Sequence, residues 1–216
     1  MKNAVLFATL SASLALGGCF GPGDPVELPD DAIEAASTCF AAQGMVMRAG
    51  KGDDVPVTYD EFVTAIKYPM VAATEVEPFS VETVMKILNG AEAKAEEIRS
   101  KDYEGAVATC DARFKIKAGE ATLPENNGDA ILSCMGLASF VQGAVQSQGS
   151  EFGGDADKIG ALTKRLEGAM SKDPDVLTKL IGGDAEAVMM EALKGAFAQG
   201  NPDAYVKACD KRFPAN

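Results

Sequence analysis

The residue types that most often perform catalysis are unevenly represented in this chain. It contains no histidine, five cysteines and 32 acidic residues. Without histidine the chain lacks the commonest general base and metal ligand, and no nucleophile can be activated by an imidazole. Paired carboxylates could still act as acid and base, as in a carboxylate-based hydrolase, but no spacing singles out one pair. We therefore expect a protein that is not an enzyme and that has no metal site and no cofactor.

The most distinctive polar motif is Cys-Asp-x-Arg-Phe, which occurs at residues 110–114 and again at 209–213. In a structural interpretation the cysteine forms a disulfide, the phenylalanine is buried, and the arginine lies near a helix C-terminus, where the macrodipole favours a cation. In a functional interpretation, Arg113 and Arg212 present guanidinium groups to an anionic ligand or partner. We favour the structural interpretation and keep both arginines as candidate contacts.

The first 19 residues follow a second recognisable pattern. Lys2 supplies a positive start, residues 4–16 form an uncharged apolar run, and the run ends in Leu16-Gly17-Gly18-Cys19. The apolar run is too short to span a bilayer. The segment resembles the signal peptide and lipobox of bacterial lipoproteins, although glycine is a less usual residue at position 17.

This resemblance implies removal of residues 1–18, a diacylglyceryl group on the sulfur of Cys19, and an acyl chain such as palmitate on its new amino group. Phe20, rather than aspartate, follows the cysteine, and in Gram-negative lipoproteins this is typical of release to the outer membrane. We therefore expect a lipid anchor in the cell envelope, on the periplasmic face of the outer membrane. Residues 19–29, which are rich in proline and glycine, are expected to form a flexible tether.

An internal duplication is visible in the rest of the chain. Residues 107–114 and 206–213 share Val, Cys, Asp, Arg and Phe, and residues 86–93 match residues 179–187 after one insertion. The two matches occur in the same order, as they would in two copies of one unit.

The duplication selects one disulfide pairing. Cys39, Cys110, Cys134 and Cys209 allow three pairings. Cys39 and Cys134 hold corresponding places near the start of each copy. Because two copies should fold alike, we expect Cys39 to pair with Cys110 and Cys134 to pair with Cys209.

Helix signals dominate and strand signals are almost absent. Gly90 in one copy and Gly182-Gly183 in the other predict a helix end or kink. Residues 188–197 have the apolar spacing of one buried helix face. Helix starts are predicted at Asp30-Asp31, at Thr58 with Glu61, and at Ser80, Asp173-Pro174 and Asn201-Pro202.

These patterns predict an all-α protein with two tandem homologous units of four to five helices, each closed by one disulfide. The units cover residues 30–114 and 128–216, and residues 115–127 link them. Whether the units pack together is left open by the sequence.

Net charge and methionine content limit the possible partners. The formal charge is −12, and no run of Lys and Arg exists that would bind a phosphate backbone, so nucleic acid is not an expected partner. Our leading hypothesis is a membrane-anchored interaction or envelope-assembly module with an envelope protein partner. The alternative is a carrier of a small apolar ligand between helices, because nine methionines can line an adaptable pocket.

Overall fold

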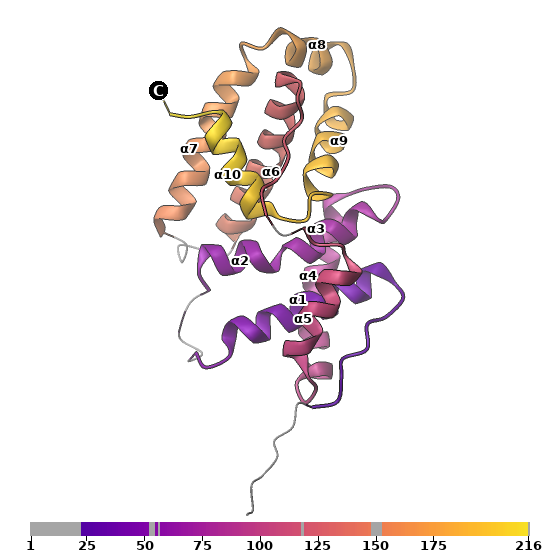
Figure 1. Cartoon of the computed structure of the whole chain (residues 1–216). Coiled ribbons are helices and arrows are strands. Elements are labelled where there is room, and N and C mark those ends of the chain that lie inside the picture. The colour runs from indigo at the N-terminus through magenta and orange to yellow at the C-terminus, as the bar shows by residue number, and fades with distance from the viewer. Residues whose placement is uncertain (1–22, 52–54, 56, 118, 148–152, 216) are drawn as a thin grey trace, which may run out of the picture.

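The computed structural model describes residues 23–51, 55, 57–117, 119–147 and 153–215 (Figure 1). Cys19 and the predicted signal peptide lie outside this range. The described residues form ten α-helices and no β-strand, which confirms the all-α class. In the first half the helices are α1 (Ala32–Arg48), α2 (Tyr59–Ala65), α3 (Lys67–Thr74), α4 (Val81–Ile98) and α5 (Tyr103–Arg113). In the second half they are α6 (Asn127–Ser147), α7 (Gly153–Met170), α8 (Pro174–Gly182), α9 (Ala185–Phe197) and α10 (Pro202–Arg212).

The predicted helix starts are confirmed, because short polar side chains accept hydrogen bonds from the first free backbone N–H groups. Thr58 and Glu61 form the expected reciprocal capping box at α2. Proline occupies the first turn of α8 and of α10, where its missing N–H does no harm. The other predicted caps are Asp31 for α1, Ser80 for α4, Asp173 for α8 and Asn201 for α10.

The predicted helix break at Gly90 is wrong. Helix α4 continues through Gly90, where α1 comes so close that a Cβ atom would lie 2.9 Å from the Ser37 Oγ. Packing between the two helices therefore outweighs the cost of about 1 kcal/mol that glycine carries inside a helix. In the second half the predicted break does occur, because α8 ends at Gly182 and Asp184 caps a new helix.

Two disulfides join the first and last helices of each half, in the predicted pairing. Cys39 of α1 is bonded to Cys110 of α5, and Cys134 of α6 is bonded to Cys209 of α10. The Cα atoms are 5.6 and 5.8 Å apart, both within the usual range for a disulfide.

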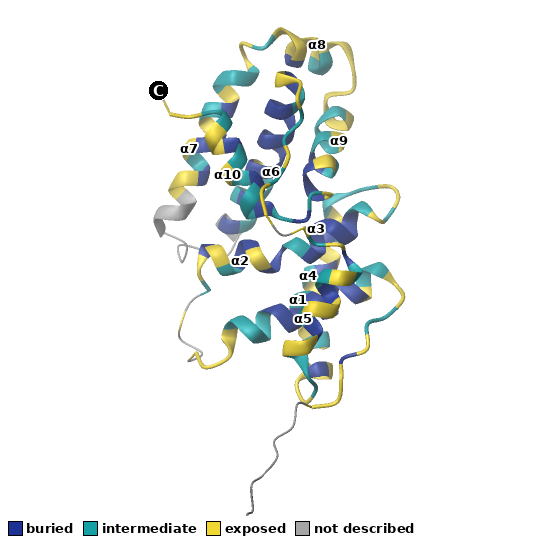
Figure 2. Cartoon of the chain, in the orientation of Figure 1, coloured by how far each residue is buried: buried dark blue, intermediate teal, exposed yellow. Residues whose placement is uncertain are grey.

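The two halves share one hydrophobic core. Figure 1 shows the second half stacked on the first, with α6 surrounded by other helices. Phe62, Ile66 and Met70 of the first half belong to the same buried cluster as Leu137 and Val141 of α6. Buried residues therefore continue from one half into the other, as the dark blue segments of Figure 2 also show.

Helix α6 is the central element of this core. By length and composition, residues 127–145 are apolar enough to cross a membrane, but 67% of that window is buried inside the fold. An apolar helix covered on most sides is the expected centre of a helical core. Its apolar sequence is therefore accounted for by packing.

The described part of the expected tether lies against the first half. The backbone N–H of Asp102 donates to the carbonyl of Asp24 at 2.9 Å. Val26 is buried in a cluster that also contains Ala42 and Ile98. Residues 24–26 therefore belong to the folded body of the protein.

Candidate functional site

A long hollow lies between parts of the two halves, beside their shared core, and we call it the interhalf groove. It encloses about 1090 Å³. The first half contributes side chains of α1, α2 and α4, and the second half contributes side chains of α6 and α9. The groove is lined by Phe40, Ala41, Gly44, Met45, Met47, Arg48, Val57, Phe62, Ala65, Ile66, Val81, Met85, Leu88, Asn89, Ala91, Glu92, Ala95, Gly136, Ser139, Phe140, Gly143, Ala144, Met189, Met190 and Leu193.

One face of α4 forms a long wall of the groove. Val81, Met85, Leu88, Glu92 and Ala95 follow one another at spacings of three or four residues, so they lie on one side of the helix. From Val81 to Ala95 this face extends about 21 Å at 1.5 Å per residue. The groove is therefore long enough for an extended ligand.

The opposite wall consists mostly of small side chains on α6. Gly136 allows α9 to come close, because a Cβ atom there would lie 3.3 Å from the Cβ of Leu193. At Gly143 a Cβ atom would meet no other atom within 4 Å. Phe140 is the large residue of this wall, and its ring packs edge to face on Phe197 with centroids 4.9 Å apart. The wall thus combines open space with one fixed aromatic ring.

Methionines supply much of the remaining lining. Of the nine methionines in the chain, Met45, Met47, Met85, Met189 and Met190 lie along the groove. Met85 is 48% exposed although it is a large apolar side chain. Unbranched thioether side chains adapt to ligands of different shape, so this lining suits a flexible apolar molecule.

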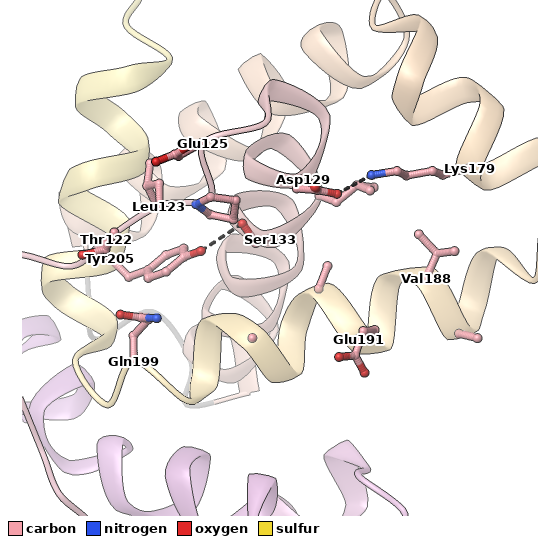
Figure 3. A pocket seen from close by; sticks show the side chains of 15 residues that line it. Thr122, Leu123, Glu125, Asp129, Ser133, Lys179, Val188, Glu191, Gln199 and Tyr205 are labelled. Atoms are coloured by element: carbon pink, nitrogen blue, oxygen red, sulfur yellow. Dashed lines mark hydrogen bonds and ion pairs between the residues drawn. The ribbon is translucent and has the colours of Figure 1, made fainter.

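A second hollow, which we call the C-terminal cleft, lies between the linker and the second half and encloses about 840 Å³. Figure 3 shows Tyr205 and Ser133 pointing toward one another and Lys179 reaching Asp129. The Tyr205 hydroxyl donates to the Ser133 Oγ at 2.9 Å, and Lys179 forms an ion pair with Asp129. The cleft is lined by Thr122, Leu123, Pro124, Glu125, Asp129, Leu132, Ser133, Lys179, Ala187, Val188, Glu191, Ala192, Gly195, Gln199 and Tyr205.

The hydroxyls of the C-terminal cleft are engaged inside the protein. Ser133 donates in turn to the carbonyl of Ala130 at 3.2 Å, and burial raises the pKa of Tyr205. Neither group is therefore prepared as a nucleophile or base, and the hydrogen bonds serve packing.

The two candidate arginines lie in different halves, and both have internal partners. Arg113 pairs with Glu75 at 3.1 Å, and its guanidinium also lies over the ring of Phe114. Arg212 donates to the backbone carbonyls of Pro124 and Glu125. Neither side chain lines the groove or the C-terminal cleft, so the structure uses both arginines to hold nearby chain segments.

The aspartates of the repeated motif are likewise engaged in internal contacts. Asp111 accepts from the Tyr68 hydroxyl at 2.8 Å and pairs with Lys67 at 2.9 Å. Burial, followed by this bond to Asp111, raises the pKa of Tyr68. Asp210 pairs with Arg165 of α7. The motif therefore anchors α5 and α10 to their neighbours.

The sequence indicated the composition of the groove but not its place. Methionine content pointed to an adaptable apolar pocket between helices, yet nothing in the sequence paired α4 with α6. Among the described residues no group of three or more Cys, Asp and Glu side chains is placed to hold a metal ion.

Comparisons with known proteins add no assignment. A scan against protein-family models finds no matching family, and searches of curated proteins and of solved structures find no match either. The geometry of the groove is therefore the main guide to what the protein does.

Proposed function

We propose that this protein is an exported, lipid-anchored carrier that holds an apolar ligand in the interhalf groove. The observation that carries this proposal is the groove itself, with its volume of about 1090 Å³ and its five methionines. Small-molecule sites are mostly apolar and commonly enclose roughly 300 to 1,000 Å³. The groove is slightly larger than the upper limit of this range, as a long ligand requires.

The lipid anchor and the envelope location belong to the same proposal. They are supported by the lipobox resemblance at residues 16–19. Two disulfides favour an oxidising compartment such as the periplasm. A carrier attached to a membrane would remain close to a source of apolar molecules.

We also propose that the two halves are homologous copies of one unit. Each half contains five described helices, and each joins its first helix to its last through a disulfide. Ser80 and Asp173 cap helices at corresponding places. On this proposal the groove arose where two copies of a helical unit packed together.

The carrier function is tested by filling the groove. A Cβ atom at Gly143 would meet no other atom within 4 Å, so the side chain of Gly143→Leu can start into the groove without displacing its neighbours. We expect the affinity for N-phenyl-1-naphthylamine, an apolar fluorescent probe, to fall at least tenfold in a fluorescence titration. About 1.4 kcal/mol of lost binding energy would suffice.

Gly168→Leu is the matched control, because Gly168 also lies in a helix with open space but outside the groove. It should bind the probe as the wild type does, and circular dichroism should show both variants folded. Equal binding by the wild type and Gly143→Leu would contradict the proposal. Native mass spectrometry of protein purified from its own cells would also count against it if every spectrum showed only the ligand-free mass.

A second candidate function is an interaction or envelope-assembly module. It is favoured by α8, where Leu177 is 39% and Ile181 is 82% exposed, one helical turn apart. Contiguous exposed apolar surface is a mark of contact with other proteins, and this pair would form the centre of such a surface on α8. Cross-linking in the native cells tests it: a reproducible partner lost on Ile181→Asp supports this function, and the same partner retained contradicts it.

A further inference from the structure

Two charged side chains, Arg48 and Glu92, are found among the residues that line the interhalf groove. Their positions follow from the direction of the helices. Lys94 of α4 lies 3.7 Å from Glu34 of α1, whereas Ile87 accepts a hydrogen bond from Ser37. From Glu34 to Ser37 the residue number on α1 rises, while that of the contacting residue on α4 falls from Lys94 to Ile87. The two helices are therefore antiparallel.

The charges consequently lie toward opposite ends of the groove. Arg48 is 11 residues beyond Ser37 on α1, a rise of about 16 Å, which places it near the first turn of α4. Glu92 lies 11 residues after Val81, about 16 Å along α4 in the other direction. One end of the groove therefore carries a cation and the other end an anion, with apolar residues between them.

Within the part of the chain that the structure describes, Arg48 has hydrogen-bonding capacity left for a ligand. Its side chain is exposed and donates to the carbonyl of Val55. A guanidinium has five N–H donors in a planar arrangement that matches carboxylate and phosphate oxygens. Met47 and Val57 line the groove beside it, so an oxyanion bound to Arg48 would lie directly next to apolar surface.

From this arrangement we infer that the ligand is a single-chain amphiphile with an anionic head, a carboxylate or a phosphate. This inference rests on the proposed carrier function and names its ligand class. The head pairs with Arg48, and the alkyl chain lies along the Met85 face of α4. Glu92 at the far end of the groove disfavours a second anionic group, so a molecule with a negative charge at both ends should bind less well.

The test is isothermal titration calorimetry with four compounds of equal chain length below their critical micelle concentrations. They are decanoate, decyl phosphate, decanol and decyltrimethylammonium, in 0.15 M salt so that the acidic surface is screened over about 8 Å. We expect the wild type to bind one or both anions about tenfold more tightly than decanol. The two anions distinguish a carboxylate head from a phosphate head.

The variant Arg48→Gln should bind the preferred anion about tenfold more weakly and decanol unchanged. Arg99→Gln is the matched control. Arg99 is also an exposed arginine of the first half, but it lies outside the groove and pairs only with Glu96 among the described residues. It should bind all four compounds as the wild type does.

The outcomes separate this inference from the carrier function. Equal binding of decanol and the anions, tighter binding of the cation, or anion binding that survives Arg48→Gln would overturn the anionic head and leave the apolar carrier standing. If none of the four compounds binds, both proposals fall.

Discussion

At the scale of single residues, Glu61 performs two tasks at the start of α2. Its carboxylate accepts from the backbone N–H of Thr58 at 2.8 Å, which completes the capping box, and it also pairs with Lys51. The bond to Lys51, followed by the bond to the Thr58 backbone, lowers the pKa of Glu61 to about 2. Helix α2 carries Phe62 into the groove, so this cap bears on the candidate site.

The lowered pKa fixes how stability should depend on pH. Because the folded state favours the charged form, the stabilisation by Glu61 is complete above its ordinary pKa of 4.5 and is lost as the pH falls toward about 2. Urea unfolding should show Glu61→Gln less stable than wild type by up to about 1 kcal/mol at pH 6, because glutamine can keep the capping-box bond but loses the negative charge at the helix N-terminus. The difference should shrink steadily below pH 4.5.

Glu27→Gln controls for the change in net charge, because Glu27 is exposed and precedes the first helix. Its effect should be small at every pH. If the difference in unfolding free energy between the wild type and Glu61→Gln stays constant down to pH 2.5, the Glu61 carboxylate does not stabilise the folded state as described.

Residue types allowed some of these roles to be predicted. The sequence placed Thr58 and Glu61 at capping-box spacing, and the duplication selected the disulfide pairs. It could not show that Arg113 would pair with Glu75, which is 38 positions away. Such contacts depend on how helices are arranged in space, which local patterns do not encode.

At the scale of elements, the contact between α1 and α4 decides the shape of one groove wall. Gly90 lies against Ser37, whose hydroxyl bonds the carbonyl of Ile87 at 3.0 Å. The sequence predicted a break at Gly90 because glycine is a weak helix former. It was wrong here and right at Gly182, since α1 provides a packing surface for Gly90 while Gly182 has open space around it.

This contact predicts coupling between two substitutions. In open space, as at Gly168, replacing glycine by alanine in a helix should stabilise the protein by about 0.5 to 1 kcal/mol. Gly90→Ala should not show this gain, because the added methyl group collides with Ser37. On a Ser37→Ala background the gain should return.

Chemical denaturation of the four proteins in this cycle, with Gly168→Ala as reference, measures the coupling. If Gly90→Ala stabilises the wild type as much as Gly168→Ala does, then α1 and α4 are not as close as described.

At the scale of the whole molecule, the shared core makes the two halves interdependent. Phe62 and Ile66 are buried against residues of the second half, so separating the halves would expose them. The sequence predicted two units but left their packing open. Periodicity identifies a buried face of a helix without naming the helix that covers it, which is why the groove could not be located in advance.

Cooperative unfolding follows from the shared core. Replacing Cys39 and Cys110 by alanine removes a cross-link across 71 residues, and on a chain-entropy model this costs about 4 kcal/mol. Because the core is continuous, we expect one shifted transition with the same midpoint for probes in either half. Two separate transitions, with the second half unaffected, would show instead that the halves fold independently.

Some of the residues that line the groove are more than 100 positions apart in the sequence, Met45 and Met189 among them. The unfolded chain therefore has no equivalent site, and whatever binds there must shift the folding equilibrium toward the native state. A ligand present at one hundred times its dissociation constant would add about 2.7 kcal/mol to the free energy of unfolding. Melting temperature alone can thus report occupancy, so lipid mixtures can be screened for a ligand of the proposed carrier before its identity is known.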